Sequence, residues 1–171
     1  KLLYGELDAI PKPWLTVIIP TYKRPNLLDE AIRSVLRQWH TNYFWDIVIV
    51  DNEAFDGQQN ENERIIRRIN NKRILYYRND AHMQTCDNFN RCILLARGQW
   101  VSMLHDDDLL VDNTLQHMGK LINAYQHLTP RTLGAISANY FQFKYNPKSK
   151  EFSNAIIADA NKTLLSISTD Y

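Results

Sequence analysis

The sequence predicts an α/β protein with a mostly parallel central sheet and helices on both faces of that sheet. Short, nearly all-apolar runs rich in Val and Ile alternate along the chain with segments of helical hydrophobic periodicity. Each of four such runs ends in polar residues, at the same place in successive units. Strands that alternate with helices form parallel βαβ units with right-handed crossovers, which gives this fold class.

Composition favours one ordinary globular domain. The chain has 171 residues, of which 44% are hydrophobic and 23% are charged. A net charge of +1 gives no electrostatic argument for nucleic-acid binding, and no run is long enough to be a transmembrane segment. A peripheral membrane contact stays open. Cys86 and Cys92 lack metal-site spacing, so we expect free thiols in a reducing cytoplasm, with Cys92 in the core.

The elements are expected in a regular order. Strands are predicted over residues 14–19, 47–50, 73–77 and 100–104, with a longer strand or two short ones over 133–145. Helices are predicted from an N-cap at Asn26, over 64–69, over 87–96 with Phe89, Cys92, Ile93 and Ala96 facing inward, and after Asp112 or Asn113. Residues 1–13, with Pro11 and Pro13, are expected to be irregular. The aromatic connector 39–45 is expected to pack on the first helix in preference to a partner or a membrane.

Ligands of parallel α/β sheets bind at the carboxyl ends of the strands. That rule brings together residues 20–24, Asp51-Asn52, residues 78–80 and residues 105–108. Three adjacent carboxylates, residues 106–108, repel one another unless water or a cation neutralises them. Their hard oxygens suit Mg²⁺ or Mn²⁺, which in turn neutralises a diphosphate. The alternative for this cluster is a surface turn that caps the next helix.

Glycine-based phosphate loops are missing from the sequence. Neither GxGxxG nor GxxxxGK[ST] occurs, and the five glycines are scattered. A dinucleotide cofactor held on a glycine turn is therefore not expected. A nucleotide can still be held without glycines, by backbone and side chains such as Tyr22, and a carboxylate such as Asp51 can accept a hydrogen bond from a pyrimidine N–H.

Six segments in order carry a resemblance to a known family. They are residues 17–24 (VIIPTYKR), 34–38 (SVLRQ), 49–52 (IVDN), 88–91 (NFNR), 96–101 (ARGQWV) and 104–110 (LHDDDLL). Over residues 14–145 the chain resembles family 2 glycosyltransferases with the Rossmann-like GT-A fold. The resemblance implies Mn²⁺- or Mg²⁺-dependent, inverting transfer of a sugar from a nucleotide-diphosphate donor, with a UDP-sugar favoured. The acceptor would be a saccharide or a lipid-linked molecule in cell-envelope polysaccharide synthesis.

The resemblance also implies site residues. The donor nucleotide would contact Pro20, Thr21, Tyr22, Arg24, Asp51, Asn52, Asn79, Asn88 and Asp106, and the metal would be held by Asp107 with Asp108. Packing for Tyr22, a capping role for Asp51 and a solvated charge for Arg24 stay open. His105 stands where the family commonly has the first Asp of Asp-x-Asp-Asp. It is expected either to assist the ribose or the metal, or to be structural.

No catalytic base is assigned. The acids after Asp108 are Asp112, Glu151, Asp159 and Asp170, and none lies in a motif typical of a base. We therefore expect a lead-in (1–13), a donor-binding domain (14–145) and, over 146–171, the truncated start of an acceptor half or a C-terminal extension, with the base outside these residues. The 171 residues would then bind donor without efficient transfer.

Location and competing functions follow from the same residues. The protein is expected in the cytoplasm, with the inner face of the membrane also open, and without a nucleic-acid partner. One alternative is a sugar-phosphate nucleotidyltransferase, although residues 22–25 lack the glycine-rich loop that it needs. The other is a non-catalytic nucleotide- or partner-binding module of degenerate transferase fold.

Overall fold

The structure is a computed structural model that describes residues 1–9, 12–39, 41–128, 141–142, 145–146, 151–152 and 156–157. The chain divides into two compact units, Lys1–Gly119 and Lys120–Tyr171. In the second unit, β6 (Phe141–Gln142) pairs antiparallel with β9 (Ile156–Ile157), and β7 (Tyr145–Asn146) with β8 (Glu151–Phe152). Most of the predicted strand region 133–145 lies outside the described residues, so the predicted domain boundary stays a prediction.

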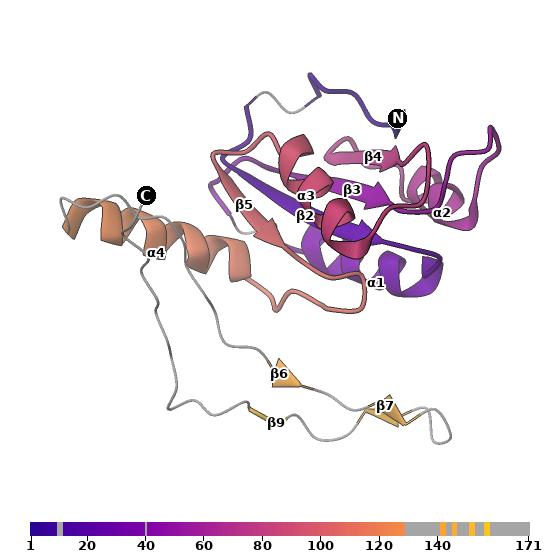
Figure 1. The fold of residues 1–171 in the computed structure, drawn as a ribbon. Coiled ribbons are helices and arrows are strands. Elements are labelled where there is room, and N and C mark those ends of the chain that lie inside the picture. Colours follow the sequence, from indigo (N-terminus) through magenta and orange to yellow (C-terminus); the bar gives the residue numbers. More distant parts are fainter. Residues whose placement is uncertain are drawn as a thin grey trace. The chain divides into compact units, whose positions relative to one another are not determined.

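The first unit is a five-stranded sheet with helices packed on it (Figure 1). Its strands are β1 (Leu2–Tyr4), β2 (Leu15–Thr21), β3 (Trp45–Asp51), β4 (Ile74–Arg78) and β5 (Trp100–Met103), in the spatial order β1-β4-β3-β2-β5. Its helices are α1 (Pro25–Leu36), α2 (Glu61–Ile69) and α3 (Thr85–Leu95), and α4 (Thr114–Leu128) follows. Strands β2 to β5 are parallel, and β1 is antiparallel to β4. The predicted α/β class is confirmed.

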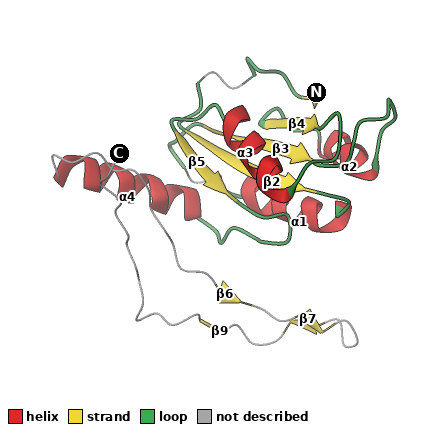
Figure 2. Cartoon of the chain, viewed as in Figure 1, coloured by secondary structure: helices red, strands yellow, loops and turns green. Residues whose placement is uncertain are grey.

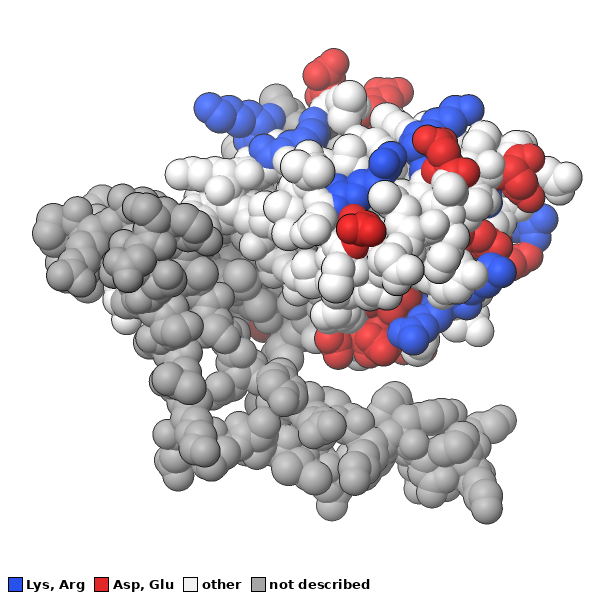
Figure 3. Space-filling model, in the orientation of Figure 1, with Lys and Arg blue, Asp and Glu red and all other residues white. Residues whose placement is uncertain are grey.

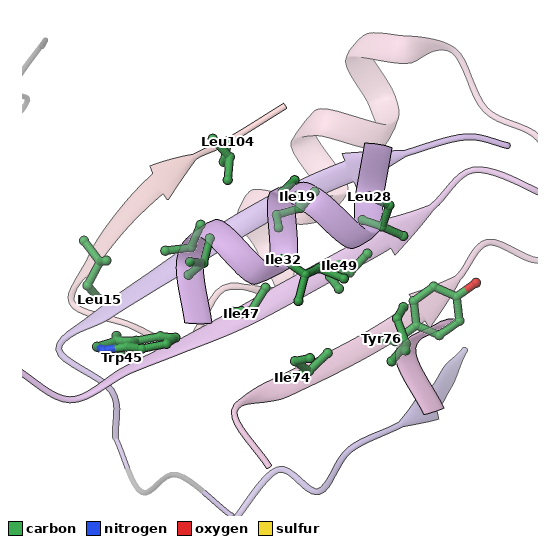
Figure 4. Packing of buried hydrophobic residues seen from close by; sticks show 14 of the residues in the cluster. Leu15, Ile19, Leu28, Ile32, Trp45, Ile47, Ile49, Ile74, Tyr76 and Leu104 are labelled. Carbon is green, nitrogen blue, oxygen red and sulfur yellow. The ribbon is translucent and has the colours of Figure 1, made fainter. Parts of the chain in front are cut away.

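Helices cover both faces of the sheet because the central strands are apolar on both sides. One core joins alternate residues of β2 and β3, such as Ile19 and Ile49, to Leu28 and Ile32 of α1 and to Ile66 of α2 (Figure 4). The other core joins the intervening strand residues, Ile18, Val48, Val50, Leu75 and Tyr77, to Cys92 of α3. The prediction that Cys92 is a core residue is confirmed, whereas Cys86 is exposed.

Three local predictions are wrong. Leu2–Tyr4 is a strand and not irregular, because it pairs with the free edge of β4. Asn26 does not cap α1: the helix begins at Pro25, whose fixed φ suits the first helical position. Pro20 does not end the first strand, since β2 continues to Thr21. It is tolerated because β2 pairs with β5 only as far as Ile18, so β3 is its one neighbouring strand there.

Two sets of hydrophobic side chains that we predicted to be packed, in the connector 39–45 and on the helix 87–96, are only partly buried. Trp45 is buried, and the Tyr43 ring lies 4.4 Å from that of Trp14, but Trp39 is 75% exposed and Phe44 is 66% exposed. Ile93 of α3, predicted to face inward, is 50% exposed. Helical periodicity identified the helix but placed its buried face about one residue off, because Asn88 takes a core position through hydrogen bonds.

A buried polar cluster fixes the amino ends of the strands. The Asp46 carboxylate accepts a 2.6 Å hydrogen bond from Thr16 and two from Arg97, at 3.1 and 2.9 Å. The Thr16 hydroxyl oxygen in turn accepts from the backbone N–H groups of Arg97 and Gly98. The Arg97-Gly98 turn before β5 is thus anchored to Thr16 of β2 and Asp46 of β3.

The surface of the described residues has mixed charge. On the face shown in Figure 3, basic and acidic side chains lie next to one another. Within the described part of the chain, no helix has both the length and the apolar character that crossing a bilayer requires. The expected lack of a nucleic-acid partner stays a prediction.

Candidate functional site

The carboxyl ends of the strands bring the predicted polar clusters together, as parallel topology requires. Asn52 N–H donates to Thr21 C=O at 2.9 Å, and Asn79 N–H donates to Asp51 C=O at 3.0 Å. Leu104 N–H donates to Ile18 C=O at 3.0 Å, which delivers the acidic residues beside the end of β2. Figure 2 shows the loops that leave this edge of the sheet.

The acidic stretch is held by a threonine and an arginine. The Thr21 hydroxyl donates to Asp106 Oδ2 at 2.8 Å. Arg24 Nη1 lies 3.2 Å from Asp106 Oδ1 and 3.1 Å from Asp107 Oδ2, so one nitrogen bridges two carboxylates. The Asp106 side chain is 8% exposed, while those of Arg24 and Asp107 are 51% and 52% exposed. The cluster is therefore anchored on its inner side and open to solvent on its outer side.

Tyr22 directly follows Thr21 in the chain and is 42% exposed. The His82 ring lies 4.9 Å from it at 50°, and Lys23 Nζ lies 5.3 Å from the centre of the Tyr22 ring. Lys23 has φ of 53°, a left-handed conformation that L-residues rarely adopt. No motif surrounds His82 in the sequence, so sequence reasoning does not identify it as a neighbour of Tyr22.

Asp51, predicted to contact the base, is buried and surrounded by donors from its own chain. Its Oδ1 accepts from Glu53 N–H at 2.9 Å. Its Oδ2 accepts from Asn60 at 2.8 Å, Asn62 at 2.9 Å and the Tyr76 hydroxyl at 2.8 Å. Burial, followed by the negative charge of Asp51, raises the pKa of Tyr76 above its ordinary value. This arrangement favours the alternative that Asp51 is structural, and its base contact stays a prediction.

Three of the predicted donor contacts form one buried amide network. Asn79 Nδ2 donates to Asn52 Oδ1 at 3.0 Å and to Asn88 Oδ1 at 2.8 Å. Asn52 also exchanges two hydrogen bonds with the backbone of Met83, at 2.8 and 2.9 Å. These side chains join the loops after β3 and β4 to α3. All the hydrogen bonds that the structure describes for these three side chains are to other residues of the chain. Their contact with a donor stays a prediction.

Arg78 is a site-edge residue that the sequence placed in a polar cluster without a role. It is buried, and its guanidinium donates to the carbonyl oxygens of Gln58 at 2.6 Å, Ala54 at 2.7 Å and Glu53 at 3.4 Å. It thereby fixes the loop between β3 and α2. A charged residue at a strand end looks the same in sequence whether it binds a ligand or its own backbone, so no local signal could have identified this role.

The remaining members of the acidic stretch are solvent-exposed. The His105 ring packs edge-on to Phe89 with centroids 5.4 Å apart, which favours the structural alternative for His105. Asp108 N–H donates to His105 C=O at 3.1 Å and closes the turn. Among the described residues, no three His, Cys, Asp or Glu side chains gather as a metal site. The metal roles of Asp107 and Asp108 stay predictions.

Comparison with known proteins decides the family. The model of the family described as glycosyl transferase family 2 matches residues 16–164. The chain belongs to this family. A GalNAc(5)-diNAcBac-PP-undecaprenol beta-1,3-glucosyltransferase from Campylobacter jejuni is 30% identical over 143 residues, which are 82% of this chain and 42% of that relative. The resemblance seen in the sequence is thus confirmed for the family.

Solved structures show the same fold. The mannosyltransferase PcManGT from Pyrobaculum calidifontis, in complex with GDP-Man and Mn²⁺, is 23% identical with a TM-score of 0.54, over 78% of this chain and 37% of that one. S. aureus TarS 1-349 in complex with UDP-GlcNAc is 16% identical with a TM-score of 0.52, over 73% of this chain and 38% of that one. The chain spans between 30% and 42% of the length of the curated relatives that it matches.

Proposed function

We propose that the chain is the donor-binding part of a glycosyltransferase that transfers a sugar from a nucleotide-diphosphate sugar, with a UDP-sugar favoured. One observation carries the proposal: oxygens of Asp106 and Asp107 converge on a single cationic nitrogen of Arg24, on the open side of the ligand-binding edge of the sheet. Tyr22, which directly follows Thr21 in the chain, is also exposed. Tyr22 would contact the base of the donor, Asp106 the ribose, and a metal ion at Asp107 the diphosphate.

The donor set fits a hard divalent cation such as Mn²⁺ or Mg²⁺. Carboxylate oxygens are the ligands that such ions prefer, and here Arg24 already occupies a point that both carboxylates reach. Asp107, with Asp108 beside it, would hold the ion. When bound, such an ion neutralises the diphosphate and stabilises it as a leaving group. The structure of PcManGT in complex with GDP-Man and Mn²⁺ is in keeping with this assignment.

The chain's own residues would position the donor. The Thr21 hydroxyl orients Asp106, whose remaining acceptor capacity suits a ribose hydroxyl. Pro20, Asp51, Asn52, Asn79 and Asn88 shape the wall of the site from within. The acceptor would be a saccharide or a lipid-linked molecule of cell-envelope polysaccharide synthesis. The name of the Campylobacter relative gives that protein an undecaprenol-linked saccharide, GalNAc(5)-diNAcBac-PP-undecaprenol. Inversion at the sugar carbon, the base that activates the acceptor and the cytoplasmic location belong to the same proposal.

Calorimetric titration of UDP with and without Mn²⁺ tests the proposal. We expect Mn²⁺ to strengthen UDP binding, and Asp107→Asn to weaken binding in Mn²⁺ at least about tenfold because the ion loses a charged ligand. The matched control is Glu30→Gln, which removes the same charge from an exposed position on α1. It should bind UDP as the unmodified chain does.

Other outcomes decide between the alternatives. Binding of UDP that is indifferent to Mn²⁺ and to Asp107→Asn would remove the metal from the proposal and favour a non-catalytic nucleotide-binding module. Failure to bind UDP, GDP or dTDP in either condition would reject donor binding altogether.

A further inference from the structure

Arg24 occupies the position that a divalent cation would need. Its Nη1 lies within 3.2 Å of Asp106 Oδ1 and 3.1 Å of Asp107 Oδ2. A divalent ion held by Asp107 with Asp108 would bind the carboxylate that Arg24 now contacts. Arg24 and the metal would therefore compete for Asp107.

We propose that Arg24 is a resident counter-ion that yields Asp107 to the metal and then pairs with the diphosphate of the donor. The inference rests on the proposed function, which it deepens. It makes metal binding and nucleotide binding depend on one another through a single side chain.

The geometry allows the exchange. Asp106 is fixed independently of Arg24, because the Thr21 hydroxyl holds its other oxygen at 2.8 Å. The Arg24 side chain is 51% exposed, and neither of its two ion pairs is fully removed from water. Release therefore costs little, since solvent screens exposed ion pairs.

Charge drives the exchange toward the donor. One guanidinium faces two carboxylates, which leaves one negative charge uncompensated in the cluster. A divalent ion held by Asp107 with Asp108 replaces the guanidinium at Asp107, so the guanidinium keeps only Asp106 of its two described carboxylate partners. A freed guanidinium next to the metal is well suited to a phosphate, because its planar fork binds two oxygens at once. Lys23 does not substitute for it, since its ammonium lies 3.8 Å from Glu53 Oε1.

The test measures Mn²⁺ binding by electron paramagnetic resonance of free Mn²⁺, with the full 171-residue chain and without nucleotide. Arg24→Gln should bind Mn²⁺ at least about fivefold more tightly than the unmodified chain, because the competing cation is gone. The matched control is Arg64→Gln, which removes the same charge from α2, where Arg64 pairs only with Glu61 among its described ion pairs. The control should leave Mn²⁺ affinity unchanged.

UDP titrations with and without Mn²⁺ complete the test. The factor by which Mn²⁺ strengthens UDP binding should fall in Arg24→Gln, since part of that coupling comes from the exchange. Unchanged or weaker Mn²⁺ binding by Arg24→Gln overturns the inference even if UDP binding remains metal-dependent. Loss of metal-dependent UDP binding in the unmodified chain instead rejects the proposed function and the inference together. Circular dichroism of both variants shows whether they fold.

Discussion

Strand β2 carries a threonine–aspartate–arginine cluster at each end, and the two clusters differ in access to solvent. At the amino end, Thr16 and Arg97 hold Asp46, whose side chain is 1% exposed. At the carboxyl end, Thr21 and Arg24 hold Asp106, whose side chain is 8% exposed. The arginines differ more: the Arg97 side chain is 23% exposed and that of Arg24 is 51% exposed.

The stoichiometry of charge also differs. The amino-end cluster pairs one arginine with one carboxylate and is neutral. The carboxyl-end cluster pairs one arginine with two carboxylates, Asp106 and Asp107, and retains a negative charge. The same three residue types therefore make a buried, neutral contact in one place and a solvent-exposed, negatively charged cluster in the other. The comparison separates a carboxylate that stabilises the fold from carboxylates that remain open to solvent.

Asp46→Ala should produce the largest effect on stability. It leaves the guanidinium of Arg97 and the hydroxyl of Thr16 without their buried acceptor, which typically costs about 3–5 kcal/mol. Urea unfolding followed by circular dichroism measures the loss. The comparison variant is Asp107→Ala at the open cluster, where the expected loss is below about 1 kcal/mol. Equal losses in the two variants would abolish the distinction between buried and solvent-exposed clusters.

Gly98→Ala should have the next largest effect. A Cβ atom at this position would lie 2.5 Å from the backbone nitrogen of Thr16 and 2.7 Å from the carbonyl oxygen of Trp100. Because backbone on two strands would have to shift, we expect a loss of about 2–3 kcal/mol in unfolding free energy. Gly57→Ala is the control: nothing lies within 4 Å there, and only the strain of φ +90° remains, about 1 kcal/mol. A smaller loss at Gly98 than at Gly57 would show that the turn before β5 is not a fixed joint.

The strands and the ligand-binding edge could be predicted from the sequence because their signals are local. Val-Ile runs identify buried parallel strands, and topology then determines where the polar residues after them meet. The predicted meeting of Thr21 with Asp106 is of this kind, and a hydrogen bond joins the two side chains.

The partners of the polar residues could not be predicted in this way. Asp51 and Asp107 both follow apolar strands, yet one is buried under four donors and the other is half exposed. The difference arises from Asn60 and Asn62, which come from the next helix and its cap. Such contacts depend on tertiary packing, so the segment around an aspartate does not reveal which donors will surround its carboxylate.

Asp51 tests whether burial of an aspartate depends on which end of the sheet it occupies or on its hydrogen-bond partners. It lies at the carboxyl end of β3 but resembles Asp46 in burial. Tyr76→Phe removes one of its four donors, and Figure 4 shows that hydroxyl pointing away from the labelled aliphatic side chains. We expect a loss of about 1–1.5 kcal/mol at pH 7, with UDP affinity unchanged within about twofold.

The pH dependence gives a second and smaller readout of the same hydroxyl. Because the pKa of Tyr76 is raised in the folded chain, its proton is kept where an unfolded tyrosine, with a pKa near 10, loses it. Its contribution to stability is therefore complete below about pH 10 and declines above it, by about 1.4 kcal/mol per pH unit.

The comparison of wild type with Tyr76→Phe isolates this contribution. Cys92, whose pKa burial raises to about 12, adds a decline of the same sign in both proteins and cancels in the difference. The gap between wild type and Tyr76→Phe should then narrow between urea titrations at pH 8 and pH 11. Suppose that the stability difference between the two proteins stays constant with pH and that the variant binds UDP more weakly. Asp51 would then be a donor-binding residue and not a structural one.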